Sequence, residues 1–397
     1  MTEQIIPASV AADPRAWTRW MLEAATRGDI AVDETTGTIH VLRYREIEAL
    51  LHEPRLRGVG LSLFDLMGIA DGPLRAWYGS LMFTNDGRAH DRLRRLVSKA
   101  FTPRAAEALR PLAAEGVAAR IEGVRKAGGG DLVVAFAGLP MHVMCALVGV
   151  PAEDVPEFIA WVDALSPVFG LMEPDQIAAA TTASTELLAY TGALRERRAR
   201  APAADLMTSL IRAEDEGDRL TRDETAAMVA NLLVGGHDTT GSQIGCTLLA
   251  LLARPHALAE LRSDPSLLPS AVAETIRFEP AITGAPRTVA EPLEIGGSLR
   301  PAGALVMGSL LTANRDPAVW RDPDAFDPRR FAAPGAPRLL SFGGGPHYCL
   351  GAALARMTLE EVVRGVAALA PRLTADPDEI AWVQVLGRSP AQVPVAA

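Results

Sequence analysis

The sequence predicts a mainly α-helical protein with a few short strands, folded as one large domain over residues 1–397. Segments with apolar residues every three or four positions indicate helices at 90–125, 175–200, 222–253, 256–263, 269–278 and 350–370. Strand-like pieces are short and occur at Ile39–Leu42, Leu293–Ile295, Ala304–Leu311 and Trp382–Leu386. No internal repeat or low-complexity linker divides the chain, and the candidate boundary at Ala201–Ala204 is too short to separate domains.

Composition narrows the class of protein. Apolar residues make up 49% of the chain and charged residues 22%, which is enough to bury a large core. The net charge is −9 and no basic stripe stands out, so we expect no nucleic-acid binding. The first residues lack the pattern of a signal peptide, and we expect a cytoplasmic monomer without a membrane anchor. Three scattered cysteines argue against a disulfide framework or a cysteine-based zinc site.

One long helix has an unusual centre. Thr221-Arg-Asp-Glu224 is a capping box, and Thr225–Ala253 is apolar nearly all round, as in a helix that crosses the middle of a protein. Its centre reads Gly235-Gly236-His237-Asp238-Thr239-Thr240. Each glycine costs about 1 kcal/mol relative to alanine there, and a buried carboxylate costs more unless it is paired. Either a second helix crosses closely at this point or the polar groups face a pocket, and the segment by itself supports both interpretations equally.

A glycine-rich loop carries Cys349 to the start of a second helix. The stretch Ser341–Arg356 reads SFGGGPHYCLGAALAR, and a thiolate at a helix N-terminus is stabilised by unpaired backbone N–H groups. A phosphate loop would need a lysine that is missing here. A Cys–His nucleophile pair using His347, or a buried structural cysteine, would leave the glycines unexplained.

This loop resembles the haem-binding loop of the cytochrome P-450 family, Phe-Gly-x-Gly-x-His-x-Cys-x-Gly. Its positions are filled by Phe342, Gly343, Gly345, His347, Cys349 and Gly351. The resemblance covers the chain from about residue 40 to the end. It implies the P-450 fold, with haem b between the long helix and the cysteine loop. It also implies that Cys349 is the axial thiolate ligand of the iron and that His347 donates to a haem propionate.

Three further charged residues resemble a structural ion-pair network of that family. Glu274 and Arg277 match its Glu-x-x-Arg motif, whose spacing places both charges on one helix face. Arg330 resembles the third member. We expect these residues to stabilise the fold and to take no part in catalysis.

The resemblance also implies cationic partners for the haem carboxylates. His90 and Arg94 match a His-x-x-x-Arg motif, and Arg287 fits a third donor, since buried carboxylates need charge-assisted hydrogen bonds. Taken singly, His90 or Arg287 is more simply a solvated residue. The segment Asn85–Ala89 departs from the family's Asp-Pro-Pro-type lead-in to His90, and we expect this to affect loop rigidity rather than haem binding.

With haem present, the centre of the long helix resembles the family's oxygen-activating acid–alcohol pair. The resemblance implies that Thr239 hydrogen-bonds the oxygen undergoing reduction and that Asp238 relays protons from solvent through water. The Cys349 thiolate would raise electron density at iron and favour O–O cleavage. His237 occupies the variable position of the motif, and we expect it to face away.

The expected substrate is a mainly hydrophobic small molecule with a polar handle, such as a bacterial secondary metabolite, terpenoid, steroid or fatty acid. The candidate contacts are Asn231, Val234, Gly235 and Thr283. The apolar segment 61–83 suits a pocket lid. Insertion of one oxygen atom of O2 into a C–H or C=C bond is the implied reaction.

Electrons must come from another protein, because the chain has no room for a reductase. A ferredoxin is the implied donor, and we expect a basic docking patch for it at Arg92, Arg95, Lys99 and Arg356.

Other haem-protein functions remain open. A non-catalytic haem sensor or carrier would need Cys349 but not Asp238 and Thr239. A peroxide-using or rearranging haem-thiolate enzyme usually lacks that acid–alcohol pair. A Cys–His hydrolase is the most distant alternative.

Overall fold

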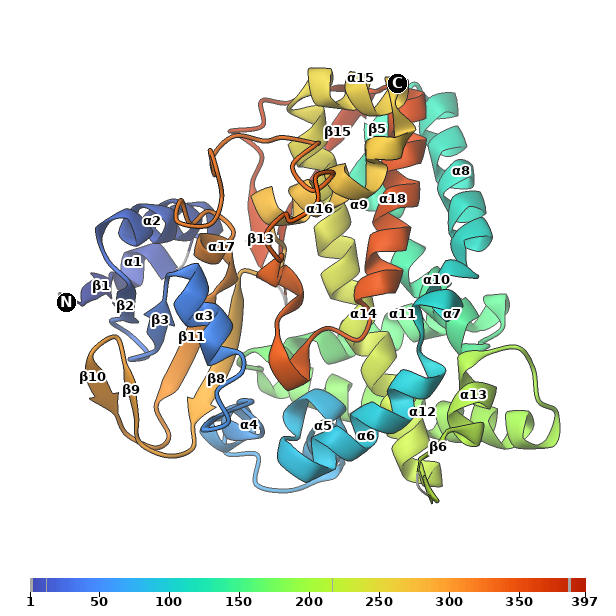
Figure 1. Ribbon diagram of the computed structural model, residues 1–397. Helices are drawn as coiled ribbons and strands as arrows, with labels where there is room; N and C mark the ends of the chain where they lie inside the picture. Colours follow the sequence, from blue (N-terminus) through green and yellow to red (C-terminus); the bar gives the residue numbers. More distant parts are fainter. Residues whose placement is uncertain (1–2, 12, 216, 385–386) are drawn as a thin grey trace.

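Two long helices lie side by side at the centre of the molecule. The computed structural model describes residues 3–11, 13–215, 217–384 and 387–397. Helix α14 (Arg222–Leu252) packs along helix α18 (Ala352–Leu369), drawn yellow-green and red in Figure 1. The predicted capping box starts α14: the Thr221 hydroxyl accepts from the backbone N–H of Glu224 at 3.2 Å, and the Glu224 carboxylate accepts from the N–H of Thr221 at 2.8 Å. The capping box prediction is therefore confirmed.

A layer of helices surrounds this central pair. The helices that pack on α14 include α10 (Leu139–Val148), α11 (Val155–Leu165), α12 (Pro174–Arg200) and α16 (Leu268–Phe278). The remaining helices are α1 (Ala8–Ala11), α2 (Pro14–Arg27), α3 (Tyr44–Leu50), α4 (Ser62–Leu66), α5 (Pro73–Ser80), α9 (Leu132–Phe136), α13 (Leu206–Arg212), α15 (Pro255–Ser263) and α17 (Leu310–Ala313), besides the three described next. No single described helix is both long and apolar enough to cross a membrane, although the bent pair α14 and α15 would satisfy that test together.

The helix expected over 90–125 is in fact three helices. Helix α6 (Gly87–Ala100), helix α7 (Pro103–Glu107) and helix α8 (Arg110–Ala127) follow one another with breaks between them. Pro103 and Pro111 each lie in the first turn of a new helix, where a missing backbone N–H does no harm. Proline thus sets the breaks that the periodicity did not reveal.

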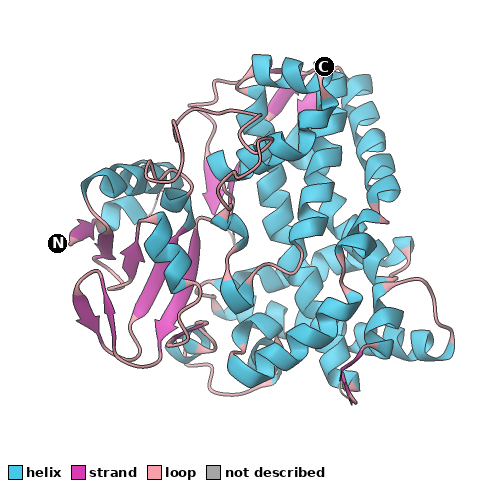
Figure 2. Ribbon diagram, viewed as in Figure 1, coloured by secondary structure: helices cyan, strands magenta, loops and turns pink. Residues whose placement is uncertain are grey.

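The largest sheet lies on one side of the helical body, at the left in Figure 2, and shorter strands lie elsewhere. The largest sheet has the order β1-β2-β3-β11-β8-β4. Its strands are β1 (Gln4–Ile6), β2 (Ile30–Asp33), β3 (Ile39–Val41), β4 (Leu56–Arg57), β8 (Gly284–Val289) and β11 (Leu305–Ser309). Smaller sheets are formed by β5 (Gly129–Asp131), β6 (Glu214–Asp215), β7 (Asp218–Arg219), β9 (Leu293–Ile295), β10 (Ser298–Arg300), β12 (Arg372–Leu373), β13 (Trp382–Gln384), β14 (Arg388–Pro390) and β15 (Pro394–Ala396).

The strand predictions are only partly confirmed. Ile39–Leu42 and Leu293–Ile295 correspond to β3 and β9. Ala304–Leu311 is too long, because β11 ends at Ser309, whose hydroxyl accepts from the N–H of Thr312 and caps α17. Trp382–Leu386 corresponds to β13, and its last two residues lie outside the described part of the chain.

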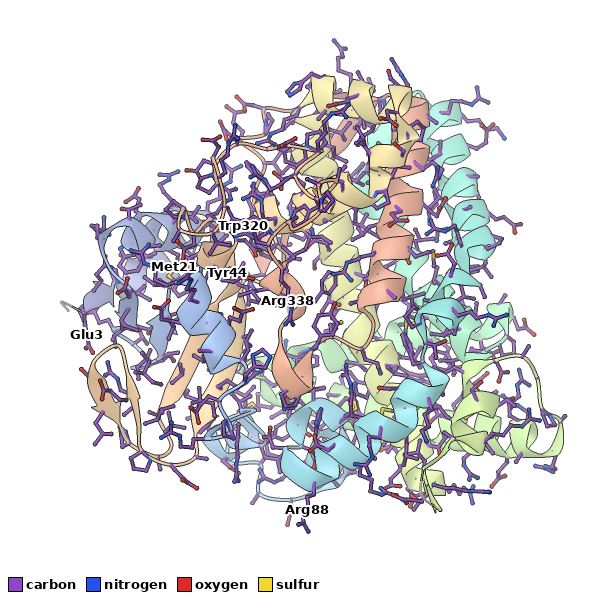
Figure 3. All side chains as sticks on the ribbon, in the orientation of Figure 1. Glu3, Met21, Tyr44, Arg88, Trp320 and Arg338 are labelled. Atoms are coloured by element: carbon purple, nitrogen blue, oxygen red, sulfur yellow. The ribbon has the colours of Figure 1, made fainter. Side chains whose placement is uncertain are left out.

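The sheet is tied to the segment that leads into the cysteine loop. Tyr44 and Trp320, both labelled in Figure 3, pack edge to face with their ring centroids 6.4 Å apart. The Tyr44 hydroxyl donates to the carbonyl of Arg338 at 2.7 Å. The Arg338 guanidinium lies 5.4 Å from the ring centroid of Tyr348, next to Cys349. These contacts hold the loop against the sheet.

A buried ion-pair network fixes the other side of that segment. Arg277 and Glu274 are both fully buried and paired at 2.7 and 2.8 Å, and Arg330 reaches the same carboxylate at 3.1 Å. Arg277 also donates to the carbonyls of Asn314 and Pro323. The expected contacts among these three residues are therefore present, and they anchor the 314–330 segment on α16.

Candidate active site

A cavity of about 430 Å³ lies between α14 and the cysteine loop, and its size is typical of small-molecule sites. Its wall is mostly apolar and comes from α14, α10, the 82–83 turn, the 281–285 segment and the loop around Cys349. Eleven of the residues singled out from the sequence border it, namely His90, Arg94, Asn231, Gly235, Thr239, Arg287, Phe342, Gly343, His347, Cys349 and Gly351. Tertiary structure thus brings together residues from distant parts of the chain.

The Cys349 thiol is exposed to this cavity while protein surrounds it on the other sides. Its backbone N–H donates to the carbonyl of Phe342 at 2.8 Å, which closes the loop. Burial raises the pKa of the Cys349 thiol, whereas the backbone N–H groups of Gly351 and Ala352 and the charge of Arg94 act in the opposite direction. The helix start thus favours the thiolate without outweighing burial, and a bound metal cation would supply the missing charge.

Four cationic or titratable side chains meet at one edge of the cavity. His90 and His347 stack with ring centroids 4.3 Å apart. Arg94 donates to the carbonyl of Tyr348 at 2.6 Å, and Arg287 donates to its neighbour's carbonyl at 2.8 Å. Burial lowers the pKa of both arginines. Among the described residues neither arginine forms an ion pair, so each can take an anionic partner.

The segment before His90 takes part in this edge, besides holding the turn whose rigidity we expected it to affect. Asp86 accepts from Nε2 of His347 at 2.8 Å and from the backbone N–H of Gly58 at 3.0 Å. Burial lowers the pKa of His347, and the Asp86 carboxylate opposes that effect. Asp86 therefore positions His347, which we expected to face a propionate, and it also holds the preceding turn.

Thr239 and Asp238, at the centre of α14, face different sides of the helix. Thr239 borders the cavity, and its hydroxyl donates to the carbonyl of Gly235 at 2.7 Å, which leaves the hydroxyl oxygen free to accept. Asp238 does not border the cavity. Its carboxylate accepts from the Ser166 hydroxyl on the side facing α11. A proton carried by Asp238 must therefore travel around the helix to reach the cavity.

Two of the four candidate substrate contacts border the cavity, and the other two do not. Asn231 and Gly235 border the cavity. Val234 is fully buried among core residues, and Thr283 uses its backbone carbonyl to accept from Leu311 at 3.1 Å. Neither Val234 nor Thr283 reaches the cavity wall, because Val234 lies on another face of α14 and the wall takes the neighbours of Thr283 instead.

Residues that the sequence analysis missed complete the wall. Met82 and Phe83 belong to the segment expected as a lid, whereas Val143 and Met144 come from α10, which carries no local signal of a site. A Cβ atom at Gly236 would lie 3.0 Å from the Met144 sulfur, so the packing interpretation holds at this glycine. At Gly235 a Cβ atom would meet nothing within 4 Å. Gly236 thus allows close packing of α10, whereas Gly235 leaves open space at the cavity. Each of the two interpretations of this segment therefore applies to one of the glycines.

Gln243 is a further missed residue. Its side-chain oxygen accepts from the N–H of Ala281 at 2.9 Å, and its amide donates to the carbonyl of Glu279 at 3.1 Å. These bonds attach the segment after α16 to α14 and thereby set the position of the strand that carries Arg287.

One of the four residues expected to form the docking patch, Arg92, is already paired within the protein. Arg92 pairs with Asp218 and with Glu224, which neutralises its charge. It stabilises the start of α14 instead. Arg95 and Lys99 are exposed, and Arg356 lies 4.3 Å from the ring centroid of Phe342.

The residues present fit a haem. A thiol stands at the start of α18, a mostly apolar wall faces it, and a buried arginine, a half-buried arginine and a pair of histidines lie at one edge. That donor set matches an iron with one thiolate ligand and a ring with two carboxylates. In the described part of the chain, no other group of side chains combines these features.

Comparison with known proteins agrees with this geometry. Residues 191–364 match the model of the family described as cytochrome P450. Nocardicin C N-oxygenase of Nocardia uniformis subsp. tsuyamanensis is 41% identical over 324 residues, which are 79% of this chain and 78% of that protein. The 6-deoxyerythronolide B hydroxylase of Saccharopolyspora erythraea is 35% identical over 354 residues, which are 86% of this chain and 85% of that protein.

Solved structures give the same result. The crystal structure of CalO2 superposes with a TM-score of 0.88 at 29% identity, and the match covers 98% of this chain and 97% of that one. The expected fold is therefore confirmed. The chain belongs to the cytochrome P450 family, and it is a monooxygenase.

Proposed function

We propose that the whole chain, residues 1–397, is a single haem domain that binds haem b with Cys349 as the axial thiolate. His90, Arg94, Arg287 and His347 would hold the two propionates, and Phe342, Gly343 and Gly351 would let the loop pass close to the ring. Bound haem would activate dioxygen for insertion of one oxygen atom into a substrate C–H or C=C bond. The presence of Cys349 and Thr239 on the wall of one cavity is the observation that carries this proposal.

The chain's own groups then handle protons. Thr239 offers its hydroxyl oxygen to the cavity because its proton is donated to Gly235. Asp238, one residue away, supplies protons through water from the α11 side. This pair supports a dioxygen-using enzyme over a haem carrier, which needs no such groups.

The substrate proposed for this cavity is a mainly hydrophobic small molecule of bacterial secondary metabolism, or a terpenoid, steroid or fatty acid. The mostly apolar wall supports this class. The names of relatives, such as the hydroxylase of 6-deoxyerythronolide B, point in the same direction. Asn231 uses its oxygen for the backbone of Met82, which leaves its amide N–H groups for a polar handle of the substrate.

Electrons are proposed to come from a ferredoxin in the cytoplasm, delivered to a monomer. Lys99 is exposed and Arg356 is half-buried beside the haem-loop residue Phe342, so both suit an acidic partner. Reversing these two charges (Lys99→Glu with Arg356→Glu) should slow reduction at low salt by about tenfold or more, since charge pairs mainly raise association rates. The control is Arg321→Glu, at a residue whose side chain is 94% exposed on a different loop. Equal rates for both proteins would contradict the docking proposal.

The decisive experiment is the visible spectrum of the reduced protein with carbon monoxide. The wild type should show the red-shifted band of a thiolate-ligated haem, and Cys349→Ala should lose it. Cys145→Ala and Cys246→Ala are matched controls, because both thiols are buried and neither borders the cavity. A wild-type protein without the band would refute the proposal.

A further inference from the structure

Four polar side chains meet where α11 and the turn after it lie against the centre of α14. Asp163 lies on α11, Ser166 follows directly after that helix, and His237 and Asp238 lie on α14. Nε2 of His237 is 3.7 Å from Oδ1 of Asp163 and 4.0 Å from Oδ1 of Asp238. His237 thus faces Asp163 and Asp238, although the sequence led us to expect only that it would turn away from the site.

This cluster runs from the surface towards the cavity. The Asp163 side chain is 63% exposed, whereas those of His237 and Asp238 are 11% and 15% exposed. Thr239, the next residue along the helix, borders the cavity. Because Asp238 does not border the cavity itself, the α11 side is the route by which solvent protons can reach it.

Ser166 and His237 have different contacts within the cluster. The Ser166 hydroxyl donates to Oδ2 of Asp238, with the carbonyl oxygen of Val162 as an alternative acceptor at 3.0 Å, and Oδ1 of Asp238 lies towards His237. Nδ1 of the buried His237 has no hydrogen-bond partner among the described residues. No hydrogen bond to a described residue therefore fixes the imidazole, whose Nε2 lies between the two carboxylates.

The electrostatics couple the same groups. Burial raises the pKa of Asp163, the neighbouring His237 lowers it, and the carboxylate of Asp238 raises it. The outer carboxyl therefore responds both to the imidazole and to the inner carboxylate.

We propose that Asp163 and His237 are the surface end of the proton supply to Asp238, and that Ser166 positions the Asp238 carboxylate to receive the proton. One proton passes from solvent to Asp163, then to Nε2 of His237 and then to Oδ1 of the Asp238 carboxylate, which releases it towards Thr239 and returns to the carboxylate. Only O–H and N–H bonds form and break, and each step moves one proton. Both gaps exceed a direct hydrogen bond, so a bridging water or a rotation of the ring carries the proton across.

The first test measures the electrostatic coupling of Asp163 to His237 and Asp238 in a protein that is not turning over substrate. We would follow the side-chain carboxyl signal of Asp163 by ¹³C NMR titration in the diamagnetic reduced carbon monoxide complex, using Asp163→Asn for assignment. His237→Gln should raise the pKa of Asp163 further, because a positive neighbour is removed. Asp238→Asn should bring that pKa down, because a negative neighbour is removed. An Asp163 titration that neither variant moves would overturn the proposal.

The second test measures how well electrons are used. Asp163→Asn and His237→Gln should each lower the product formed per electron pair by about tenfold, which is less than the 10²–10⁴ typical of a directly placed acid or base. The loss should deepen as the pH rises, because fewer protons are available. Ser166→Ala should show a weaker form of the same defect. The matched control is Glu157→Gln, an exposed acid on the same helix, which should behave like the wild type.

This inference depends on the proposed role of Asp238 and Thr239, and the two can fail separately. If Thr239→Ala lowers product per electron pair while His237→Gln and Asp163→Asn match the wild type at every pH, only the surface route is wrong. If Thr239→Ala has no effect in a protein that shows the thiolate band, the acid–alcohol role itself is wrong.

Discussion

The side-chain oxygen of Asn231 is committed to the protein backbone before any substrate enters the cavity. It accepts from the N–H of Met82 at 2.8 Å, and both residues are buried at the cavity wall. A residue expected from the sequence to contact the substrate thus also has a structural role. The oxygen holds the turn, and the amide nitrogen remains for a ligand.

Replacing this amide should cost stability. Asn231→Ala leaves the buried N–H of Met82 without a partner, so the free energy of unfolding should fall by about 1–3 kcal/mol. Urea denaturation measures the loss, and hydrogen exchange should show faster exchange at the Met82 amide. Unchanged exchange at that amide would mean that the bond is not maintained in solution.

A second residue links stability to pH. His40 is buried against Trp17, and burial lowers its pKa to about 4 despite the nearby Asp33, which raises it. The unfolded chain therefore binds more protons than the folded chain between about pH 6.5 and pH 4, so stability is complete above pH 6.5 and falls below it. Between pH 7 and pH 5 this residue should account for a loss of about 1–2 kcal/mol, at about 1.4 kcal/mol per unit of pKa difference.

His40→Leu provides the comparison, because a leucine at this position does not titrate. The difference in unfolding free energy between pH 7 and pH 5 should be smaller in the variant than in the wild type. Identical differences in the two proteins would show that folding does not change the pKa of His40.

At the scale of elements, the ion pairs of α16 differ from surface ion pairs because they are fully buried and attach another segment of the chain to the helix. Glu274 and Arg277 have no exposure, and Arg277 uses its remaining donors on the carbonyls of Asn314, Pro323 and Ala325. Such a network attaches a long irregular segment to a helix. A charge left without its partner at this buried position would not be solvated by water.

Glu274→Gln should therefore lower the free energy of unfolding by about 3–5 kcal/mol, because it leaves two arginines facing a neutral amide. The exposed pair Glu260 with Arg329 is the control. Glu260→Gln should cost less than about 1 kcal/mol. Equal losses in the two variants, measured by chemical denaturation, would contradict the structural role of the network.

The two central glycines of α14 make a second prediction at this scale. Gly235→Ala should stabilise the helix by up to about 1 kcal/mol, since alanine is the better helix former and its methyl group meets open space. The same methyl group projects into the cavity, so substrate-induced spectral shifts should weaken.

Gly236→Ala is the matched comparison for that prediction. Its methyl group would lie 3.0 Å from the Met144 sulfur, so the gain should be reduced or reversed by displacement of that side chain. Thermal denaturation of the two variants measures the difference. A larger gain at 236 than at 235 would contradict the packing described here.

At the scale of the whole molecule, the cavity is the place where the parts of the fold meet. Helix α14, helix α6, strand β8 and the loop before α18 each contribute to its wall. A ligand that fills it therefore binds the folded state alone, and such binding is worth about 2.7 kcal/mol at a hundred times the dissociation constant.

Removing the haem should accordingly lower the thermal midpoint. Hydrogen exchange should become faster in the 339–351 loop and in α6, which border the cavity, and should change little in the network around Glu274. Re-addition of haem should reverse the effect in the wild type. Uniform destabilisation across the chain would show that the haem does not act through these elements.

The sequence by itself determined those features whose partners lie close along the chain. The capping box at Thr221 and the Glu274–Arg277 spacing depend on residues three positions apart, and the cysteine loop lies within ten consecutive residues, so the local sequence was sufficient. The helix over 90–125 was wrong for the same reason, because periodicity continued across prolines that restart the helix.

Tertiary structure alone decided which distant residues meet. Asp86 reaches His347 across 261 residues, and Ser166 reaches Asp238 across 72. Arg92 lost its expected role because folding placed Asp218 and Glu224 beside it. Such contacts depend on how helices and strands pack, and packing depends on the whole chain at once. The sequence therefore predicted the cysteine loop, whereas the contact of Asp86 with His347 and the cluster beside Asp238 required the fold.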